Sequence, residues 1–550
     1  MKQILLLLWG IVFLPTYIFS QTGTSAGHFK ISENGSSLGL SNGANFGFVG
    51  ETLDENRIFL GAPLDGNGKL FITELETDGS PGEFEIISSQ NFDLFSSTEG
   101  ARFGGSAVEL LTGETYIIGA PGYDSGGSLF KVSQTDENYT IEELQKPEEL
   151  NEVSDFGSFL ALDGEFILAY SSVGEGSIYR MGLEGNQLTL VETIDANNSF
   201  LAEKLDAGDE FGSGLSVYDL NGDGNTDILC GAPGDDDQNE DYGAAYVLYR
   251  NNNKEITGIQ KYSRLEGDFG GFMNAQDDFG ISIRGIGDLD ENGYDDLAIG
   301  APGDDDGGLD IGAVWILFLR PDGTVKDEKK INRLEGNFDG DINFQDNFGK
   351  RIATVGDLNG DGTVDIISGS VLDDDGGTDR GAAFTIFIER CPAPSGDFDF
   401  EVEGGTVQFF AEGGEGYTYI WNFDDGGYSQ EQNPVHTYES NGTFWVCLAI
   451  NNDCGGNNFC KNVTVSTLSV EDQIREQTKV FPNPATNLVN IQSPVHIEEI
   501  SLMDITGKMV YEALPNSMNT TIELDRFPAG VYIVKWLASG NTFVERIQIQ

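Results

Sequence analysis

The stretch FGSGLSVYDLNGDGNTDILCGAP, residues Phe211 to Pro233, contains the motifs that decide the fold. It begins with a Phe-Gly pair, passes through the acidic segment DLNGDGNTD and ends in Gly-Ala-Pro. Short runs rich in apolar and β-branched residues flank the acidic segment, as expected of two strands joined by a turn. An acidic turn on its own needs no bound ion, because Asp, Asn and Gly favour turns for backbone reasons. The stretch therefore predicts a β-hairpin, and its repetition decides the rest.

The same order of motifs recurs along the chain, with successive Phe-Gly pairs 53 to 69 residues apart. Units of this length that contain about four short strands are typical of β-propeller blades. The second signature has changed in two units, to AYS at Ala169 in the third and to GSV at Gly369 in the sixth. The Phe-Gly pairs begin at Phe46, Phe103, Phe156, Phe211, Phe279 and Phe348, and Gly-Ala-Pro begins at Gly61, Gly119, Gly231 and Gly300.

These repeats resemble the FG-GAP propeller family, best known from the head of integrin α subunits, over roughly residues 29–390. The resemblance implies an all-β propeller, a Ca²⁺ ion in each intact acidic loop and ligand binding through other loops, and it implies no catalytic reaction. The sixth unit ends after its third strand at Arg390, and HFKISENG lies where a strand would precede the first Phe-Gly pair. We therefore expect the N-terminal strand to complete the last blade, which removes an exposed sheet edge. Six blades are favoured over the seven of integrins.

Three acidic loops share one spacing of oxygen-bearing side chains: DLNGDGNTD at 219–227, DLDENGYDD at 288–296 and DLNGDGTVD at 357–365. Ca²⁺ takes roughly six to eight oxygen ligands, and the glycine at the sixth position of each loop permits a sharp turn. We therefore predict about three Ca²⁺ ions, one for each loop. Each loop ends at an Asp in the ninth position, between strands, whereas an EF-hand loop lies between helices. The predicted ligands are Asp219, Asn221, Asp223 and Asp227 with the carbonyl of Asn225; Asp288, Asp290, Asn292 and Asp296 with the carbonyl of Tyr294; and Asp357, Asn359, Asp361 and Asp365 with the carbonyl of Thr363.

The first three units lack this spacing, so we expect them to be free of ions. A second acidic series follows the Gly-Ala-Pro positions, reading GDDDQNEDYG from Gly234, GDDDGGLDIG from Gly303 and LDDDGGTDRG from Leu372. These segments are further cation sites, a rim that faces a ligand, or solvated loops. The solvated loop is favoured, because runs of one charge sign commonly do no more than keep a surface soluble.

The net charge limits the classes of partner. The chain has 550 residues, and its 91 acidic against 30 basic residues give a formal charge of −61. Nucleic acids and anionic membranes require a positive potential, so neither is an expected partner. The three histidines, His28, His436 and His496, fall in separate segments and offer no material for a zinc site or a Ser-His-Asp triad. No catalytic residue set stands out.

The N-terminal segment MKQILLLLWGIVFLPTYIFSQ has a lysine, an apolar run and a small residue at Ser20, as in a secretory signal peptide. We expect residues 1–20 to be removed and the chain to be exported, and no later apolar run reaches the length of a membrane span. Export permits disulfide bonds. Cys230 is expected to be free and buried, and three connectivities are open for the other four cysteines. Our preferred pairing joins Cys447 with Cys460 across a hairpin and Cys391 with Cys454.

Two further domains are expected after the propeller, which we place at residues 21–390. WNFDDG from Trp421 and NPVHTY from Asn433 resemble the PKD family of immunoglobulin-like β-sandwiches, over 391–466, in which His436 has a structural role. After a linker at 467–479, the motifs PNP at Pro482, DITG at Asp504 and PAGVY at Pro528 resemble the C-terminal sorting domain of the bacterial type IX secretion system, over 480–550. This second β-sandwich implies the type IX machinery as a partner and a location on the cell surface or in the medium.

The sequence thus predicts an all-β chain, with a propeller followed by two immunoglobulin-like sandwiches. Our first hypothesis is a secreted or surface-bound, Ca²⁺-binding protein without enzymatic activity that adheres to a glycan or protein ligand. The alternative is a polysaccharide hydrolase or lyase built on the propeller, because paired carboxylates can cleave glycans. A third hypothesis is a structural component of the cell surface, with the PKD domain as a spacer.

Overall fold

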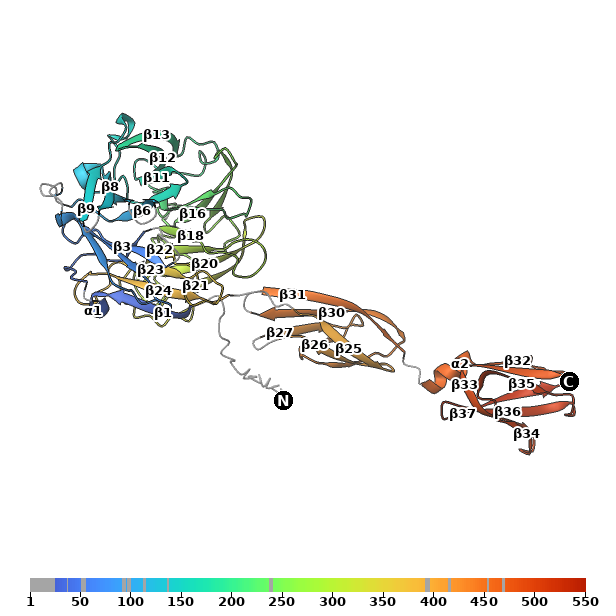
Figure 1. Ribbon diagram of the computed structural model, residues 1–550. Coiled ribbons are helices and arrows are strands. Elements are labelled where there is room, and N and C mark those ends of the chain that lie inside the picture. The colour runs from blue at the N-terminus through green and yellow to red at the C-terminus, as the bar shows by residue number, and fades with distance from the viewer. Residues whose placement is uncertain are drawn as a thin grey trace, which may run out of the picture. The chain divides into compact units, whose positions relative to one another are not determined.

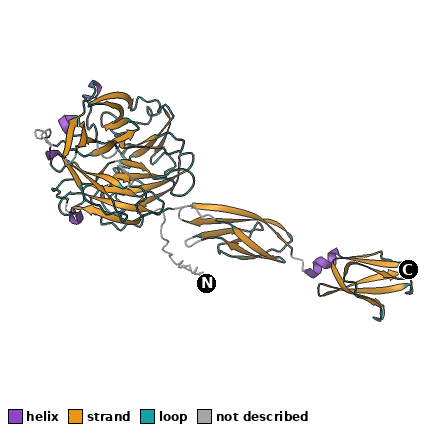
Figure 2. Ribbon diagram, in the orientation of Figure 1, coloured by secondary structure: helices purple, strands orange, loops and turns teal. Residues whose placement is uncertain are grey.

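The structure is a computed structural model, and it consists almost entirely of β-strands (Figure 2). Two compact units divide the chain, Met1–Ala393 with Asn452–Gly455 and Pro394–Asn451 with Gly456–Gln550, and we describe each by itself. The predicted signal peptide, Cys391 and Cys454 lie outside the described residues. The residues described are 25–36, 38–50, 56–91, 95, 100–111, 115–135, 138–236, 241–390, 396–413, 417–452, 455–466 and 470–550.

The first unit is a propeller of four-stranded antiparallel blades (Figure 1). Four blades are separate sheets, and two are joined into an eight-stranded sheet by a parallel bridge between Gly214 and Ser282. Six blades therefore occur among the described residues, as predicted. Blades 1 to 3 comprise β2 (Phe48–Val49), β3 (Arg57–Ala62), β4 (Lys69–Glu74) and β5 (Glu85–Ser88); β6 (Ser106–Leu111), β7 (Thr115–Ala120), β8 (Ser128–Thr135) and β9 (Asn138–Glu143); and β10 (Leu160–Asp163), β11 (Phe166–Ser171), β12 (Ser177–Glu184) and β13 (Gln187–Ile194). Blades 4 and 5 comprise β14 (Ser213–Tyr218), β15 (Asp227–Ala232), β16 (Ala244–Arg250) and β17 (Ile256–Tyr262); and β18 (Ser282–Gly285), β19 (Leu297–Ala301), β20 (Ala313–Leu319) and β21 (Val325–Ile331).

The N-terminal strand closes the ring. Blade 6 consists of β22 (Phe348–Thr354), β23 (Ile366–Ser370), β24 (Ala382–Ile388) and β1 (Ser25–Ser32). β1 pairs antiparallel with β24 and lies beside it at the edge of the propeller (Figure 1). The predicted completion of the last blade is therefore confirmed, and a short helix, α1 (Glu33–Ser36), follows the strand.

The Phe-Gly and Gly-Ala-Pro motifs recur because they form the interfaces between blades. A Cβ atom at Gly300 would lie 2.0 Å from the carbonyl oxygen of Gly349 in the next blade, so any side chain there would collide with backbone. Gly349 itself has a φ of +90°, a left-handed conformation that glycine adopts without strain. The last interface has the same geometry, because a Cβ atom at Gly369 would lie 2.0 Å from the oxygen of Gly47 in blade 1. GSV in the sixth unit thus retains the residue that the contact requires.

In the third unit the structure corrects the position of the altered motif. The amide of Gly104 donates to the carbonyl of Gly119 at 3.0 Å in blade 2, and the amide of Gly157 donates in the same way to Tyr170 at 3.1 Å. Tyr170, rather than Ala169, therefore takes the place of the first glycine of the motif. The altered motif thus begins one residue later than the sequence indicated, and the strand pairing places Ala169 opposite Leu160.

The blades are held together by buried side chains on both faces of each sheet. All six phenylalanines of the Phe-Gly pairs are fully buried. Cys230 in β15 is a free, buried thiol, as predicted. Burial raises the pKa of this thiol, so it stays protonated and packs as a small apolar group.

The second unit begins with two sheets over residues 396–466, β25-β26-β29 and β28-β27-β30-β31. Trp421 lies between them, and His436 stacks on Phe423 at 4.1 Å while its Nε2 lies 2.7 Å from a carboxylate oxygen of Asp425. These contacts give His436 the structural role that the sequence predicted. The strands are β25 (Phe398–Glu403), β26 (Thr406–Ala411), β27 (Thr418–Asn422), β28 (Tyr428–Ser429), β29 (Val435–Thr437), β30 (Gly442–Asn452) and β31 (Gly455–Val465).

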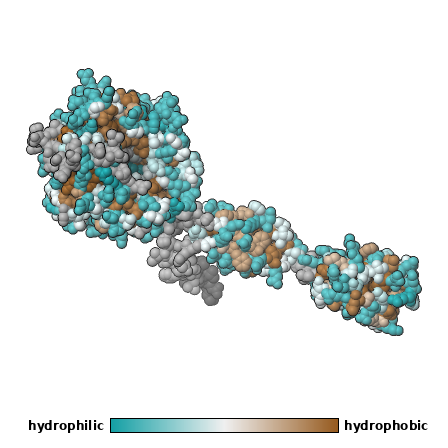
Figure 3. All heavy atoms as spheres, viewed as in Figure 1, coloured by the Kyte–Doolittle hydropathy of each residue, from teal (hydrophilic) through white to brown (hydrophobic). Residues whose placement is uncertain are grey.

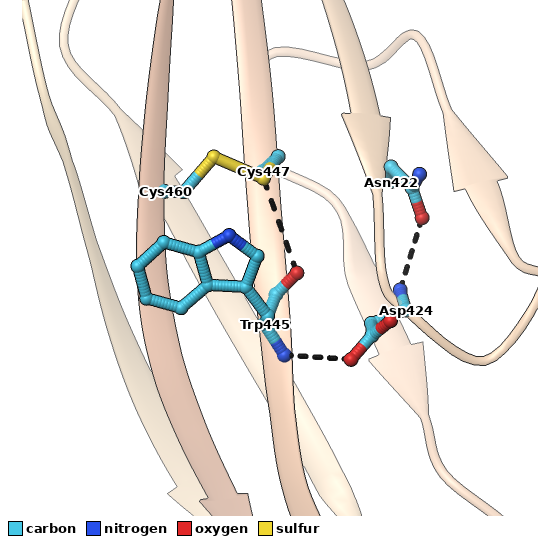
Figure 4. The surroundings of a disulfide bond; sticks show 5 residues. All are labelled: Asn422, Asp424, Trp445, Cys447 and Cys460. Carbon is cyan, nitrogen blue, oxygen red and sulfur yellow. Dashed lines mark hydrogen bonds between the residues drawn. A yellow bond between two sulfur atoms is a disulfide. The ribbon is translucent and has the colours of Figure 1, made fainter.

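A disulfide bond joins Cys447 in β30 to Cys460 in β31, with the sulfurs 2.11 Å apart, which confirms this part of the predicted pairing (Figure 4). On the same strand the amide of Trp445 donates to a carboxylate oxygen of Asp424 at 2.9 Å. The Trp445 side chain is about half exposed. Figure 3 shows residues of apolar and intermediate hydropathy, in brown and paler shades, on the visible face of this part of the chain.

The C-terminal part is a six-stranded sheet preceded by the helix α2 (Val470–Gln477). Its longest strand, β33, pairs with four others. Fully buried side chains from β33 and β36 form its core, among them Ile500 and Val534. The strands are β32 (Lys479–Phe481), β33 (Leu488–Asp504), β34 (Met509–Ala513), β35 (Ser517–Glu523), β36 (Gly530–Ala538) and β37 (Asn541–Ile549).

Candidate metal centres

The three acidic loops occupy the same place in consecutive blades. Each connects the first strand of its blade to the second: β14 to β15, β18 to β19, and β22 to β23. The Phe-Gly pair precedes or begins the first strand, and Gly-Ala-Pro or its altered form lies at the end of the second, so the acidic loops lie at the opposite end of the blade from both motifs. We call the loops at 219–227, 288–296 and 357–365 the first, second and third acidic loop.

In the second acidic loop the structure brings three predicted ligands together. Asp288, Asp290 and Asp296 each offer a carboxylate oxygen, and these oxygens lie within 4.8 Å of one another. Among the described residues, no other group of three or more Asp, Glu, His or Cys side chains has ligand atoms this close together. Asp290 and Asp296 are buried, and Asp288 is partly exposed.

The first position of each loop fixes the turn. Asp288 accepts hydrogen bonds from the backbone amides of Asn292 at 2.9 Å and Gly293 at 2.7 Å, one on each carboxylate oxygen. Gly293 has a φ of +88°, so the glycine at the sixth position is needed for this turn. The equivalent bonds join Asp219 to the amides of Asp223 and Gly224, and Asp357 to those of Asp361 and Gly362.

The third and fifth positions continue the same network. Asp290 accepts a bond from the amide of Asn292, and the side-chain oxygen of Asn292 accepts one from the amide of Tyr294. The side chains of these positions are therefore oriented by the backbone of the loop itself, as are their counterparts in the other two loops. Those counterparts are Asn221 with Asp223, Asp223 with Asn225, Asn359 with Asp361, and Asp361 with Thr363.

The Asp at the ninth position has a structural role that the sequence reasoning missed. Asp296 is fully buried, and its two oxygens accept bonds from the amide of Leu289 at 2.8 Å and from that of Leu319, in the third strand, at 2.9 Å. Burial raises the pKa of Asp296 to about 8. Asp227 and Asp365 make the same two bonds, and burial raises the pKa of each to about 6. The signal in the sequence was that each Asp begins a run of buried apolar residues.

Basic side chains from other segments reach two of the loops. Lys326 in β21 places its ammonium nitrogen 2.7 Å from Asp290 Oδ2. Arg390 donates to the carbonyl of Gly362 in the third loop at 2.8 Å and pairs with Glu291 of the second loop at 2.6 Å. Neither contact was predicted, because these cations lie far from the loops in the sequence.

The donor set of the second acidic loop fits a hard divalent cation. It consists of oxygen atoms, which such ions prefer, and three of them belong to carboxylates. Burial first, and then repulsion from Asp290, raise the pKa of Asp288, and a bound cation would oppose both effects. The arrangement can therefore hold a metal ion, with Lys326 as a competing positive charge.

The second acidic series contains buried ion pairs. The prediction that these segments are only solvated loops is therefore wrong for the first aspartate of each segment. Each of these aspartates is buried and pairs with a lysine of the outermost strand of the same blade. The pairs are Asp235 with Lys261 at 2.8 Å, Asp304 with Lys330 at 2.7 Å, and Asp373 with Lys30 at 2.7 Å. The first aspartate thus fastens the loop to the outer strand. Residues 237–240 of the first segment lie outside the described residues.

Three family models match the chain. The FG-GAP repeat matches residues 211–248 and 279–317, which contain the first and second acidic loops. The chain carries integrin-like FG-GAP repeats. A PKD domain matches residues 399–467, and a secretion system C-terminal sorting domain matches residues 479–550.

Integrin α subunits are similar in sequence to the FG-GAP repeats. Integrin alpha-4 of Xenopus laevis is 32% identical over 292 residues, which are 50% of this chain and 26% of that protein. Integrin alpha-5 of Xenopus laevis is 27% identical over 302 residues, 50% of this chain and 27% of that protein. Integrin alpha-7 of Homo sapiens is 34% identical over 171 residues, 31% of this chain and 13% of that protein. The chain thus spans about a quarter or less of the length of these relatives.

Two solved structures are also similar in part. The PKD1 domain of Vibrio anguillarum Epp has 25% identity and a TM-score of 0.13, covering 14% of this chain and 96% of that one. PorZ, a surface component of the type-IX secretion system of Porphyromonas gingivalis, has 13% identity and a TM-score of 0.26, covering 91% of this chain and 70% of that one.

The sorting domain indicates type IX secretion, to the cell surface or into the medium. A search of the described residues for a helix with the length and apolar character needed to cross a membrane finds none. The FG-GAP repeats therefore belong to a chain whose sorting domain indicates an extracellular location.

Proposed function

We propose that this chain is a secreted or surface-bound, Ca²⁺-stabilised binding protein that recognises a glycan or protein ligand and performs no catalysis. The observation that carries the calcium part is the convergence of three carboxylates in the second acidic loop. The first and third loops share its backbone hydrogen bonds to the Asp at the first position, which supports extending the proposal to them. About three ions are bound, one for each loop, through the side chains and carbonyls at positions 1, 3, 5, 7 and 9.

Bound Ca²⁺ supplies positive charge to carboxylates that otherwise repel one another. The chain's own residues do the positioning. The Asp at the first position orders the turn, and the buried Asp at the ninth ties the loop to the third strand of the blade. Since a loop of this kind links three parts of one blade, ion binding stabilises the propeller and leaves its opposite end free for recognition.

We place the functional parts of the chain at the boundaries that the sequence suggests. The propeller at 21–390 binds the ligand, the PKD domain at 391–466 acts as a spacer, and the sorting domain at 480–550 engages the type IX machinery. The helix α2 lies within the proposed linker at 467–479, so this linker is not uniformly extended.

Equilibrium dialysis with metal analysis tests the calcium part. Uptake of about three Ca²⁺ ions per chain is expected at millimolar Ca²⁺, and no uptake would overturn it. A panel of polysaccharides tests the binding part, because a binding protein retains the polymers at unchanged length. Reproducible shortening of a polymer, abolished by a single carboxylate substitution, would establish the polysaccharide-acting enzyme instead.

A further inference from the structure

A cavity of about 310 Å³ lies on the axis of the propeller, at the end opposite the acidic loops. Every blade contributes to its lining, and the residues involved lie next to the Phe-Gly pairs or at the Gly-Ala-Pro segments. One contributor from each blade, in order, is Phe48, Arg102, Phe159, Glu210, Ile281 and Arg351. We call this space the central cavity. Its volume is at the lower end of the roughly 300–1,000 Å³ of ligand pockets.

Arg351 is a buried cation without an anionic partner. Its side chain is 7% exposed, and its guanidinium carbon lies 3.7 Å from the ring centre of Phe159 and 4.9 Å from that of Phe48. Its hydrogen bonds are two long contacts, to the carbonyls of Lys350 at 3.5 Å and Ser158 at 3.4 Å. No carboxylate of the described residues lies within 4.0 Å of it. A guanidinium has five N–H donors, so most of its capacity is unused.

The charge of Arg351 is costly in the protein as it stands. Burial, with the nearby Arg284 as the second cause, lowers the pKa of Arg351 to about 9. Removing an unpaired charge from water is unfavourable, and an anion of suitable shape would compensate it. A fork of donors beside two rings matches a carboxylate, which accepts two parallel hydrogen bonds.

The other two basic groups of the central cavity lie near carboxylates. Arg102 pairs with Asp155 at 2.7 Å, and Lys350 lies 3.9 Å from Asp278. Glu210 is the second carboxylate of the lining, and burial raises its pKa. The lining thus holds three basic side chains, Arg102, Lys350 and Arg351, against two acidic ones, although the chain as a whole carries −61.

We propose that the central cavity binds the carboxylate of a sugar acid, with Arg351 as the group that recognises it. This inference rests on the proposed binding function and deepens it by naming the class of ligand. The rings of Phe48, Phe159 and Tyr170 line the cavity beside the guanidinium. Phe159 and Tyr170 are buried, so the partly exposed ring of Phe48 is the apolar surface on which a sugar ring packs. Ser172 and Asp155 belong to the same lining, where Ser172 donates to Asp155 at 3.0 Å, and the remaining lone pairs of their oxygens can accept from the hydroxyls of a sugar. The small volume favours one or two sugar rings over a polypeptide segment.

Isothermal titration calorimetry on the full secreted chain in Ca²⁺ buffer tests the proposal, with D-glucuronate, D-glucose and N-acetyl-aspartate amide as probes. We expect glucuronate to bind about tenfold or more tightly than glucose, because glucose lacks the carboxylate. Arg351→Gln should remove this preference. Arg264→Gln is the matched control, because Arg264 also stacks on a ring, that of Tyr242 at 4.6 Å, but does not line the cavity. Equal binding of glucuronate and glucose, or an unchanged preference in Arg351→Gln, would overturn the proposal, and tighter binding of the aspartate derivative would replace the sugar acid by an acidic peptide.

A crystal structure of the unsubstituted chain with glucuronate provides a second readout if Arg351→Gln does not fold. The carboxylate is expected on the Arg351 guanidinium, and a sugar bound elsewhere would overturn the proposal. The outcomes separate this inference from the function on which it rests. A chain that takes up Ca²⁺ and retains a polysaccharide, but binds glucuronate no better than glucose, loses only the inference. A chain that takes up no Ca²⁺ and retains no polymer loses the proposed function.

Discussion

The ammonium group of Lys326 lies 2.7 Å from the carboxylate of Asp290, at the third position of the second acidic loop. Asp290 is buried and Lys326 is mostly so, which strengthens the pair relative to a surface salt bridge. The residue aligned with Lys326 in the outer strand of blade 4 is Thr257, and the one in blade 6 is Ala26. A lysine at this position is therefore particular to the second loop, and it competes with any cation that Asp290 binds.

Lys326→Met should raise the Ca²⁺ affinity of the second acidic loop by about threefold or more, because the substitution removes a competing charge but retains the length of the side chain. The effect is best isolated in a chain that also carries Asp223→Ala and Asp361→Ala, which disable the other two loops. Calorimetric titration with Ca²⁺ then reports one site. Lys329→Met is the control, because Lys329 belongs to the same strand and pairs with Asp327 at 3.6 Å, away from the loop. Equal affinities in the two methionine variants would contradict the competition.

Asp223→Ala should lower the number of bound Ca²⁺ ions from about three to about two, since it removes the fifth-position ligand of the first loop. In Ca²⁺ buffer the variant should melt at a lower temperature than the unsubstituted chain. In EDTA the difference between the two melting temperatures should be smaller, because part of the loss comes from the missing ion. Metal analysis after dialysis and thermal melts measure both quantities. Asp78→Ala serves as the control: Asp78 caps an exposed turn in blade 1 through Ser80, and its loss should leave the ion count unchanged. An unaltered count in Asp223→Ala would remove Asp223 from the ligand set.

Much of the propeller could be predicted from the sequence, because each blade repeats the same local pattern. The spacing of the Phe-Gly pairs gave the blade count, and the missing fourth strand in the last unit implied the pairing of β1 with β24. The position of Tyr170 could not be predicted, because strand register depends on the pairing partner. The altered motif AYS at Ala169 does not by itself show which residue pairs with the neighbouring strand.

The candidate sites were less accessible to sequence reasoning, because their partners come from distant segments. Lys326 follows Asp290 by 36 residues and meets it only after the blade has folded. Arg351 lies in the strand segment GKRIATVG, which has no binding motif, and its surroundings come from Phe48 in blade 1 and Phe159 in blade 3. Spacing along one segment predicted the acidic loops, whereas only the closed ring brings the lining of the central cavity together.

Asp277→Asn should stabilise the chain at alkaline pH. Burial first, and repulsion from Asp304 among the later causes, raise the pKa of Asp277 to about 7, whereas an unfolded Asp titrates near 4. The protonated carboxyl of Asp277 therefore makes its full contribution to the free energy of unfolding below about pH 4, and this contribution is lost as the pH rises through about 7. Asn remains neutral and can still accept the bond from the amide of Asn274. Chemical denaturation at pH 8 should show a gain of roughly 1–3 kcal/mol in the free energy of unfolding.

The gain from Asp277→Asn should disappear at pH 4, where the native carboxyl is already protonated. Asp268→Asn is the matched control, because Asp268 belongs to the same connecting segment but is largely exposed. A gain of equal size at both pH values would show that the effect does not come from the titration of Asp277.

Replacing both Cys447 and Cys460 by Ser should destabilise the domain at 396–466 by about 3 kcal/mol, since the bond closes a short loop in the unfolded chain. The transition of the propeller should not move, because the disulfide joins β30 to β31 in the second unit. Differential scanning calorimetry of the full chain follows both transitions. Thr443→Val is the control on the same pair of strands, where Thr443 and Thr464 share a hydrogen bond at 2.8 Å. A shift in the double serine variant no larger than that of Thr443→Val would contradict the expected contribution.

Gly369→Ala tests whether the ring closes through the same contact that joins the other blades. The Gly-Ala-Pro motif has been lost in the sixth unit, yet a Cβ atom at Gly369 would lie 2.0 Å from the oxygen of Gly47. Since that oxygen belongs to the backbone of blade 1, it cannot move unless the interface opens. The free energy of unfolding should therefore fall by about 3 kcal/mol or more, the upper end of what overpacking costs. Gly300→Ala should cause a similar loss, because the Gly300 contact with Gly349 has the same distance.

Gly258→Ala distinguishes the blade interface from a general intolerance of the glycines. Gly258 lies in the outer strand β17, where the nearest atom to an added Cβ would be 3.9 Å away, and its φ is outside the left-handed region. Its replacement should change the free energy of unfolding by less than about 1 kcal/mol. If Gly369→Ala were as mild as Gly258→Ala while Gly300→Ala remained severe, the junction of blades 6 and 1 would be looser than the others. Closure would then depend on the pairing of β1 with β24, which truncation before Phe29 would weaken.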